Sequence, residues 1–161
     1  MSRVNLNFKN WNFSVDKQTI SETYERIETP GVESCGCDNC LNFAAQRTNI
    51  YPTEIKELFN KLGINWMKET EVSHYARTAP EQHYYGGWFH FKGNFEGPNC
   101  EVPTGHDGNG YTLELTPISE NFSIGFRYGN ALTAFSETKE LVQIEFECKI
   151  PWVLTDKPEP E

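Results

Sequence analysis

Three of the five cysteines of this 161-residue chain lie within six residues, as Cys35, Cys37 and Cys40. Three thiols spaced this closely can converge on one centre, and Gly36 between the first two gives the loop freedom to turn. Structural zinc sites have four tetrahedral ligands, with sulfur at about 2.3 Å, and the metal keeps its cysteines as thiolates. The spacing therefore predicts a metal site, with zinc as the expected ion.

Only three of these four ligands are local, so the fourth is expected from elsewhere in the chain. A second Cys-x-x-Cys pair, which would identify a zinc site more firmly, is absent from the sequence. Single cysteines and histidines must therefore be considered. The main candidates are Cys148, His74 and His90, and the further ones are Cys100, His83 and His106.

Two other interpretations of the same cysteines involve no structural metal. In the first, all three are free thiols: Cys37 and Cys40 pack beneath a helix, and Cys35 is exposed and idle. In the second, Cys37 and Cys40 form a redox pair at the start of a helix, where the pKa of a thiol is lowered. Redox pairs of this kind belong in a strand–helix–strand setting, and the antiparallel strands predicted below disfavour one here.

A second candidate site is formed by Trp88, His90 and Lys92, which alternate with phenylalanines and so face the other side of a strand. If that face lines a groove, the three side chains would bind a ligand by stacking and hydrogen bonding. The alternative is the partly exposed second face of a sheet, which is the commoner arrangement. The sequence contains no hydrolase elbow, zincin, P-loop or dinucleotide-binding motif. No residue is therefore assigned a catalytic role.

Two helices are expected to carry and flank the cysteine loop. Asp38 is a favourable N-cap for a helix that runs to about Asn49. In a second helix, four apolar residues recur at i, i+3, i+4 and i+7 and form one stripe. Gly63 stands where a left-handed residue ends a helix, so that Ile64 packs back on the stripe. The stripe consists of Ile55, Leu58, Phe59 and Leu62.

Strand-like alternation dominates the rest of the chain. The clearest run is Val142 to Ile150, in which apolar residues alternate with Gln143, Glu145 and Glu147. Alternation of this kind is typical of antiparallel strands with one buried face. Two short strands are also expected before residue 16, with a tight turn or a bulge at Lys9-Asn10 between them. Residues 16–34 fit a helix and an extended segment equally. The sequence thus predicts an α+β fold: an antiparallel sheet of about five to seven strands with two α-helices packed on one face.

The length and composition predict one folded domain over residues 1–154. Aromatic residues make up 14% of the chain, whereas disordered chains are poor in them. Residues 155–161 form a short acidic, proline-rich tail that is expected to be disordered. No stretch approaches the ~20 apolar residues of a membrane-spanning helix, and no secretory signal begins the sequence. An odd number of clustered cysteines favours the reducing cytoplasm over an oxidising compartment.

The formal net charge of −9 excludes the common classes of nucleic-acid-binding protein, which need a basic patch. The acidic excess is concentrated between Gly93 and Phe126, where glutamate and aspartate occur but lysine and arginine do not. A solvated acidic surface that aids solubility is the simpler interpretation. The alternative is a docking surface for a basic partner or a cation site.

Three motifs resemble a family of small uncharacterised bacterial proteins. They are Cys35-x-Cys37-x-x-Cys40-x-Asn42-Phe43, the run Tyr-Gly-Gly-Trp-Phe-His-Phe at 85–91, and Ile-Pro-Trp-Val-Leu at 150–154. The resemblance spans about Cys35 to Leu154 and leaves the first strands outside it. It implies a bacterial origin and assigns no activity.

Taken together, these patterns predict a non-catalytic binding or interaction module of the bacterial cytosol, with a zinc-stabilised cysteine loop and a protein partner that the sequence does not name. The alternative function is a small metal-dependent hydrolase. In that case three of these ligands would hold Zn²⁺, and an open fourth position would activate water. A closed four-ligand site would indicate structure, and an open one beside a cleft would indicate catalysis.

Overall fold

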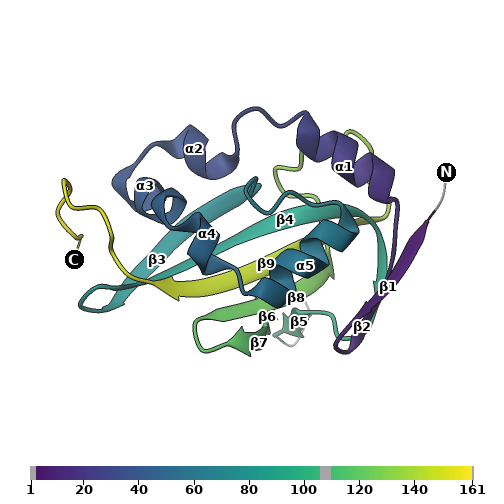
Figure 1. The fold of residues 1–161 in the computed structure, drawn as a ribbon. Coiled ribbons are helices and arrows are strands. Elements are labelled where there is room, and N and C mark those ends of the chain that lie inside the picture. The colour runs from purple at the N-terminus through teal and green to yellow at the C-terminus, as the bar shows by residue number, and fades with distance from the viewer. Residues whose placement is uncertain (1–2, 106–109, 161) are drawn as a thin grey trace.

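One large sheet with a layer of helices over one face makes up the molecule in a computed structural model, which describes residues 3–105 and 110–160 (Figure 1). The helices are α1 (Lys17–Glu25), α2 (Gly31–Cys35), α3 (Asp38–Ala45), α4 (Arg47–Ile50) and α5 (Thr53–Leu62). The strands are β1 (Val4–Phe8), β2 (Trp11–Val15), β3 (Glu71–Ala79), β4 (Gln82–Glu96), β5 (Glu101–Thr104), β6 (Gly110–Leu113), β7 (Thr116–Ser119), β8 (Phe122–Tyr128) and β9 (Leu141–Ile150). Among the described residues, no helix has the length and apolar character needed to cross a membrane.

The main sheet has seven strands, all paired antiparallel, in the order β1-β2-β4-β9-β8-β7, with β3 also paired to β4. β5 and β6 form a separate two-stranded sheet. The 15-residue β4 is the centre of the arrangement. β9 pairs with it along one edge, while β3 and β2 pair with the two ends of its other edge.

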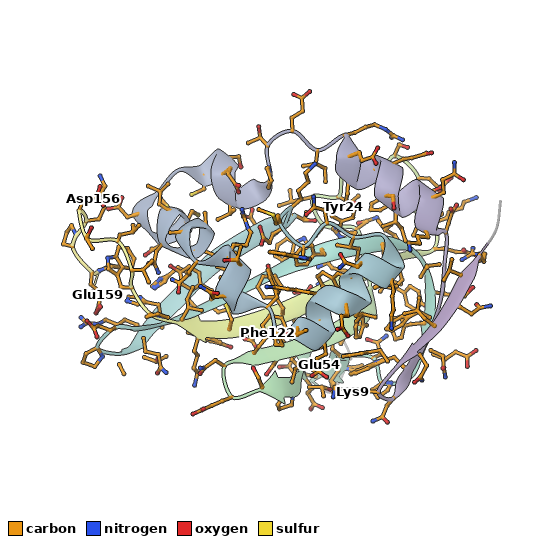
Figure 2. The ribbon with its side chains drawn as sticks, viewed as in Figure 1. Lys9, Tyr24, Glu54, Phe122, Asp156 and Glu159 are labelled. Atoms are coloured by element: carbon orange, nitrogen blue, oxygen red, sulfur yellow. The ribbon has the colours of Figure 1, made fainter. Side chains whose placement is uncertain are left out.

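A tyrosine hydroxyl fills the gap that β3 and β2 leave between them on β4. The backbone of Trp88 is paired toward the β3 side and that of Lys92 toward β2, which leaves His90 facing neither strand. Tyr24 of α1 donates its hydroxyl hydrogen to the His90 carbonyl at 2.7 Å and accepts the His90 N–H at 3.1 Å. Figure 2 shows Tyr24 beneath α1, at the sheet. Both backbone groups of a buried residue are thereby satisfied.

The core lies between the helices and the sheet, and its centre is aromatic. Every residue of the expected stripe on α5 is buried. Phe59 from that stripe meets Phe89 of β4 edge to face, with ring centroids 4.9 Å apart. Gly63 ends the helix with φ at 93°, and the N–H of Ile64 returns to the Phe59 carbonyl at 2.9 Å. The stripe and the glycine-ended C-terminus are thus confirmed.

The α+β class and the antiparallel sheet are confirmed, and the helical layer contains more elements than the two helices expected. The helix expected from Asp38 to about Asn49 is divided into α3 and α4 at Gln46, whose side chain donates to the carbonyls of Asn42 and Pro151. Residues 17–25, which the sequence left open, form α1. The one-domain boundary and the disorder of the tail stay predictions.

Removing the Tyr24 hydroxyl tests its role on β4. Tyr24→Phe leaves the two buried backbone groups of His90 without their partner, so it is expected to cost about 1–3 kcal/mol of unfolding free energy. Reversible urea unfolding measures the loss. Tyr111→Phe removes the hydroxyl of a ring that is 54% exposed and should change stability by less than about 0.5 kcal/mol. Equal effects of the two changes would contradict the role given to Tyr24.

The α5 stripe can be tested in the same way. Phe59 is fully buried, so Phe59→Ala leaves a cavity and is expected to cost roughly 3–5 kcal/mol. Urea unfolding of the variant gives the value, and a loss below about 1 kcal/mol would be too small for a buried phenylalanine.

Candidate metal centre

The cysteine loop is the short connection between α2 and α3. α2 ends at Cys35, and Gly36 turns the chain with φ at 70°, a left-handed conformation that glycine adopts without strain. Cys37 is the N-cap of α3, and its sulfur accepts the N–H of Cys40 at 3.4 Å. The N-cap is therefore Cys37, one residue before the Asp38 expected from the sequence. The loop turns the three side chains toward one point.

The three sulfur atoms lie within 4.8 Å of one another. Those of Cys35 and Cys37 are 3.1 Å apart, and both residues are exposed, whereas Cys40 is buried. All three are free thiols in the structure. They lie close enough together to bind a single metal ion, and the exposed pair lets an ion enter from solvent.

The surroundings of the loop shift the pKa values of the Cys35 and Cys40 thiols in opposite directions. Hydrogen bonds from the Cys37 side chain and backbone N–H lower the pKa of the Cys35 thiol. Burial raises the pKa of Cys40, and the neighbouring thiols raise it further. Adjacent thiolates repel one another, so this loop cannot easily carry several negative charges by itself. A bound cation would remove that repulsion.

A buried ion network fixes the helices that carry the loop. Arg47 of α4 is almost fully buried and donates to Glu33 of α2 at 2.6 Å. The same guanidinium donates through Nε to Glu69, just before β3, at 3.0 Å. Tyr51 donates its hydroxyl hydrogen to Glu69 at 2.7 Å. α2, α4 and the start of β3 are thereby held together on the loop's side of the sheet.

Backbone contacts secure α3 as well. Tyr85 of β4 donates its hydroxyl hydrogen to the Asn39 carbonyl at 2.7 Å. The buried Asn42 side chain donates to the Pro151 carbonyl at 3.0 Å and accepts the N–H of Val153 at 2.7 Å. The cysteine loop and the segment after β9 are therefore joined, although more than 100 residues separate them in sequence.

The expected fourth ligands lie outside the cysteine cluster. Among the described residues, Cys35, Cys37 and Cys40 are the one group of three or more ligand atoms within 4.8 Å of each other, so neither Cys148 nor His74 nor His90 belongs to it. Cys148 is buried in β9, His74 contacts His83 at 2.8 Å, and His90 contacts Gln143 at 3.0 Å. Cys100 is buried, and His106 lies outside the described residues.

The second candidate site is arranged around residues 129–140, which connect β8 to β9. The indole N–H of Trp88 donates to the Ala131 carbonyl at 2.9 Å, and Lys92 donates to the Lys139 carbonyl. His90 is buried and contacts Gln143, which accepts the N–H of Ala131. Trp88 and Lys92 thus contact this connection directly, and His90 contacts it through Gln143. A ligand at this position stays a prediction.

The sequence analysis did not predict two buried contacts between polar side chains. One is the Arg47–Glu69 pair; the other is the His74–His83 contact, in which His83 is fully buried and its Nε2 lies 3.7 Å from Glu159. Figure 2 shows Glu159 in the C-terminal segment at the β3–β4 end of the sheet. The partners are distant in sequence or belong to different elements, so no local spacing signalled either contact.

The surface cavities formed by described residues include four of 110–460 Å³, and none of these four is lined by the three cysteines.

No protein-family model, curated protein or solved structure matches the chain. The resemblance to small bacterial proteins stays a prediction, and the function must be inferred from this chain's own residues.

The burial of His90 predicts a pH dependence. Desolvation lowers the pKa of the ring to about 4, from about 6.5 in an unfolded chain. Between these values the unfolded state binds more protons, so the contribution of His90 to stability is complete above pH 6.5 and is lost as the pH falls toward 4. At about 1.4 kcal/mol per unit, the loss reaches about 3 kcal/mol.

NMR titration of the His90 ring and urea unfolding between pH 7 and pH 4 test this expectation. His90→Asn, which removes the titrating ring, should lose less stability over the same interval. A ring that titrates near 6.5 in the folded protein would contradict the burial of His90.

Proposed function

We propose that this protein is a non-catalytic metal-binding and interaction module whose Cys35, Cys37 and Cys40 hold Zn²⁺. The observation that carries the proposal is the convergence of three sulfurs within 4.8 Å on one loop. Thiolates are ligands that Zn²⁺ prefers, and a bound ion offsets the repulsion between them. The ion would tie the end of α2 to the first turn of α3, so its binding free energy would also stabilise the fold.

A reducing compartment suits the proposal. All five cysteines are free, and two of the three buried ones, Cys100 and Cys148, are separate from the cysteine loop. Thiols remain available as ligands in the cytosol, where disulfides are rare. We therefore place the protein in the cytoplasm, with a protein as its partner.

The hydrolase alternative receives less support. A catalytic zinc needs an open coordination position and a cleft that takes the substrate. The exposure of Cys35 and Cys37 supplies the first, but no cavity described above is lined by the cysteines. In the non-catalytic site that we propose, a group of the partner protein would fill the fourth position.

Metal content and stability test the proposal. Protein purified without a histidine tag should hold about one zinc per chain by elemental analysis. Cys37→Ser removes one ligand and should release the ion. That variant and the chelator-treated protein should both melt earlier, by roughly 2–4 °C for each kcal/mol of lost stabilisation.

Cys100→Ala is the matched control, because it also removes one thiol but from a buried position outside the loop. It should keep the full zinc content, whatever its effect on stability. Less than about a tenth of an equivalent of any transition metal, with the exposed Cys35 and Cys37 of the folded protein reacting freely, would overturn the proposal.

A further inference from the structure

A groove of about 460 Å³ lies where β4, β9 and β8 meet β7, away from the cysteine loop. Glu147 of β9 is one of its lining residues, as are Ser123 of β8, which pairs with it, and Tyr84 of β4, which pairs with Lys149. Side chains alternate along β9, and Phe146 packs against Tyr51 in the core, so Glu147 points to the face that the helices leave uncovered. Figure 1 shows β7, β8 and β9 side by side below the helices.

Glu147 is a half-buried carboxylate without a counter-ion in the described structure. No lysine, arginine or histidine nitrogen of the described residues lies within 4.0 Å of it, although Lys149 also lines the groove. Burial raises the pKa of the carboxyl group, with no opposing charge to lower it. The neighbouring Glu145 differs, because Arg127 and Gln143 both donate to it. An unpaired carboxylate in a partly dry groove favours a cationic ligand.

The ring of Tyr84 lines the groove near this carboxylate, and Tyr75, which is not one of the lining residues, packs against it. Tyr84 and Tyr75 meet edge to face, with centroids 5.1 Å apart. Tyr75 is 54% exposed and lies over Gly86, where any Cβ would meet its ring at 2.3–2.6 Å. Gly86 pairs with Glu147, so the exposed ring lies close to the carboxylate. The faces of such rings attract organic cations, in addition to the attraction of a carboxylate.

The size and charge of the groove select among cations. A bare metal ion needs several oxygen ligands close together, whereas the described residues contain no such cluster here. The volume suits an organic group. Glu120 also lines the groove, within the acidic stretch between Gly93 and Phe126, so the surroundings favour a basic partner.

We infer that this groove binds the alkylammonium group of a lysine side chain from a basic partner protein. The ammonium pairs with Glu147, and the methylene chain lies against Tyr84 and Tyr75. This site is separate from the metal loop and does not depend on zinc.

The test uses a small lysine probe and its neutral counterpart. N-acetyl-lysine methylamide is titrated into the full-length protein and followed by ¹H–¹⁵N NMR. It should give saturable shifts at the groove, with a Kd on the order of 1 mM, as expected for so small a ligand. N-acetyl-norleucine methylamide, which has the carbon chain but no charge, should bind at least about tenfold more weakly.

Two variants locate the site. Glu147→Gln removes the charge at nearly the same volume and should weaken lysine binding roughly tenfold. Tyr84→Leu keeps an apolar wall without the ring and should weaken it severalfold, which gives a second result if Glu147→Gln misfolds. Glu114→Gln removes the same charge from an exposed residue outside the groove and should leave Kd unchanged.

Three outcomes would overturn the inference: no saturable binding of the lysine compound, equal binding of the norleucine compound, or an unchanged Kd in both groove variants. Each can occur whether or not the protein holds zinc, so failure here is distinct from failure of the proposed metal site.

Discussion

Two hydrogen bonds between the Tyr24 hydroxyl and the backbone of His90 fill the gap between β3 and β2 along one edge of β4. β4 pairs with three strands but has only two edges, so β3 and β2 must share one of them. A buried backbone group without a partner is costly, and His90 lies at the boundary between these two strands. One hydroxyl that both donates and accepts meets both needs, and it ties α1 to the centre of the sheet.

A second constraint acts on the other side of the helical layer. Arg47 and Glu69 are buried together, and burying charges is expensive unless each finds its partner. The arrangement of α2, α4 and the start of β3 that pairs them is also the arrangement that presents the cysteine loop. Glu33 extends the network to α2, which ends at Cys35. The buried ion pair and the cysteine loop are therefore coupled through the position of α2, which contains Glu33 and ends at Cys35.

The two proposed binding sites lie on different parts of the fold and use different chemistry. The cysteine loop offers soft sulfur ligands at the junction of two helices. The Glu147 groove offers the carboxylates of Glu147 and Glu120 and the ring of Tyr84, against which Tyr75 packs, on the uncovered side of the sheet. A metal bound at the cysteine loop would leave the opposite face of the sheet free to meet a partner. This separation agrees with an interaction module in which the ion has a structural role.

The sequence by itself determined the α5 stripe, the strand alternation of β9 and the cysteine cluster, but not the division of the helical layer into five helices. The spacing of Ile55, Leu58, Phe59 and Leu62 and the alternation from Val142 to Ile150 each depend on the geometry of a single helix or strand, so they could be predicted locally. The same holds for Cys35, Cys37 and Cys40, which one tight turn brings together. Alternation also placed Glu147 on the outward side of its strand. In these cases the residues that matter are neighbours in the chain.

Only the tertiary structure decided which distant residues meet. His90 alternates onto the same side as Trp88 and Lys92, yet it is buried there because residues 129–140 fold over it. Arg47 pairs with Glu69 across 22 positions, and Asn42 reaches Pro151 across 109. The groove at Glu147 exists because β4 and β8 flank β9 and β7 borders its rim. Such contacts follow from strand order and helix docking, which minimise buried, unpaired polar groups over the whole chain rather than within any short stretch of it.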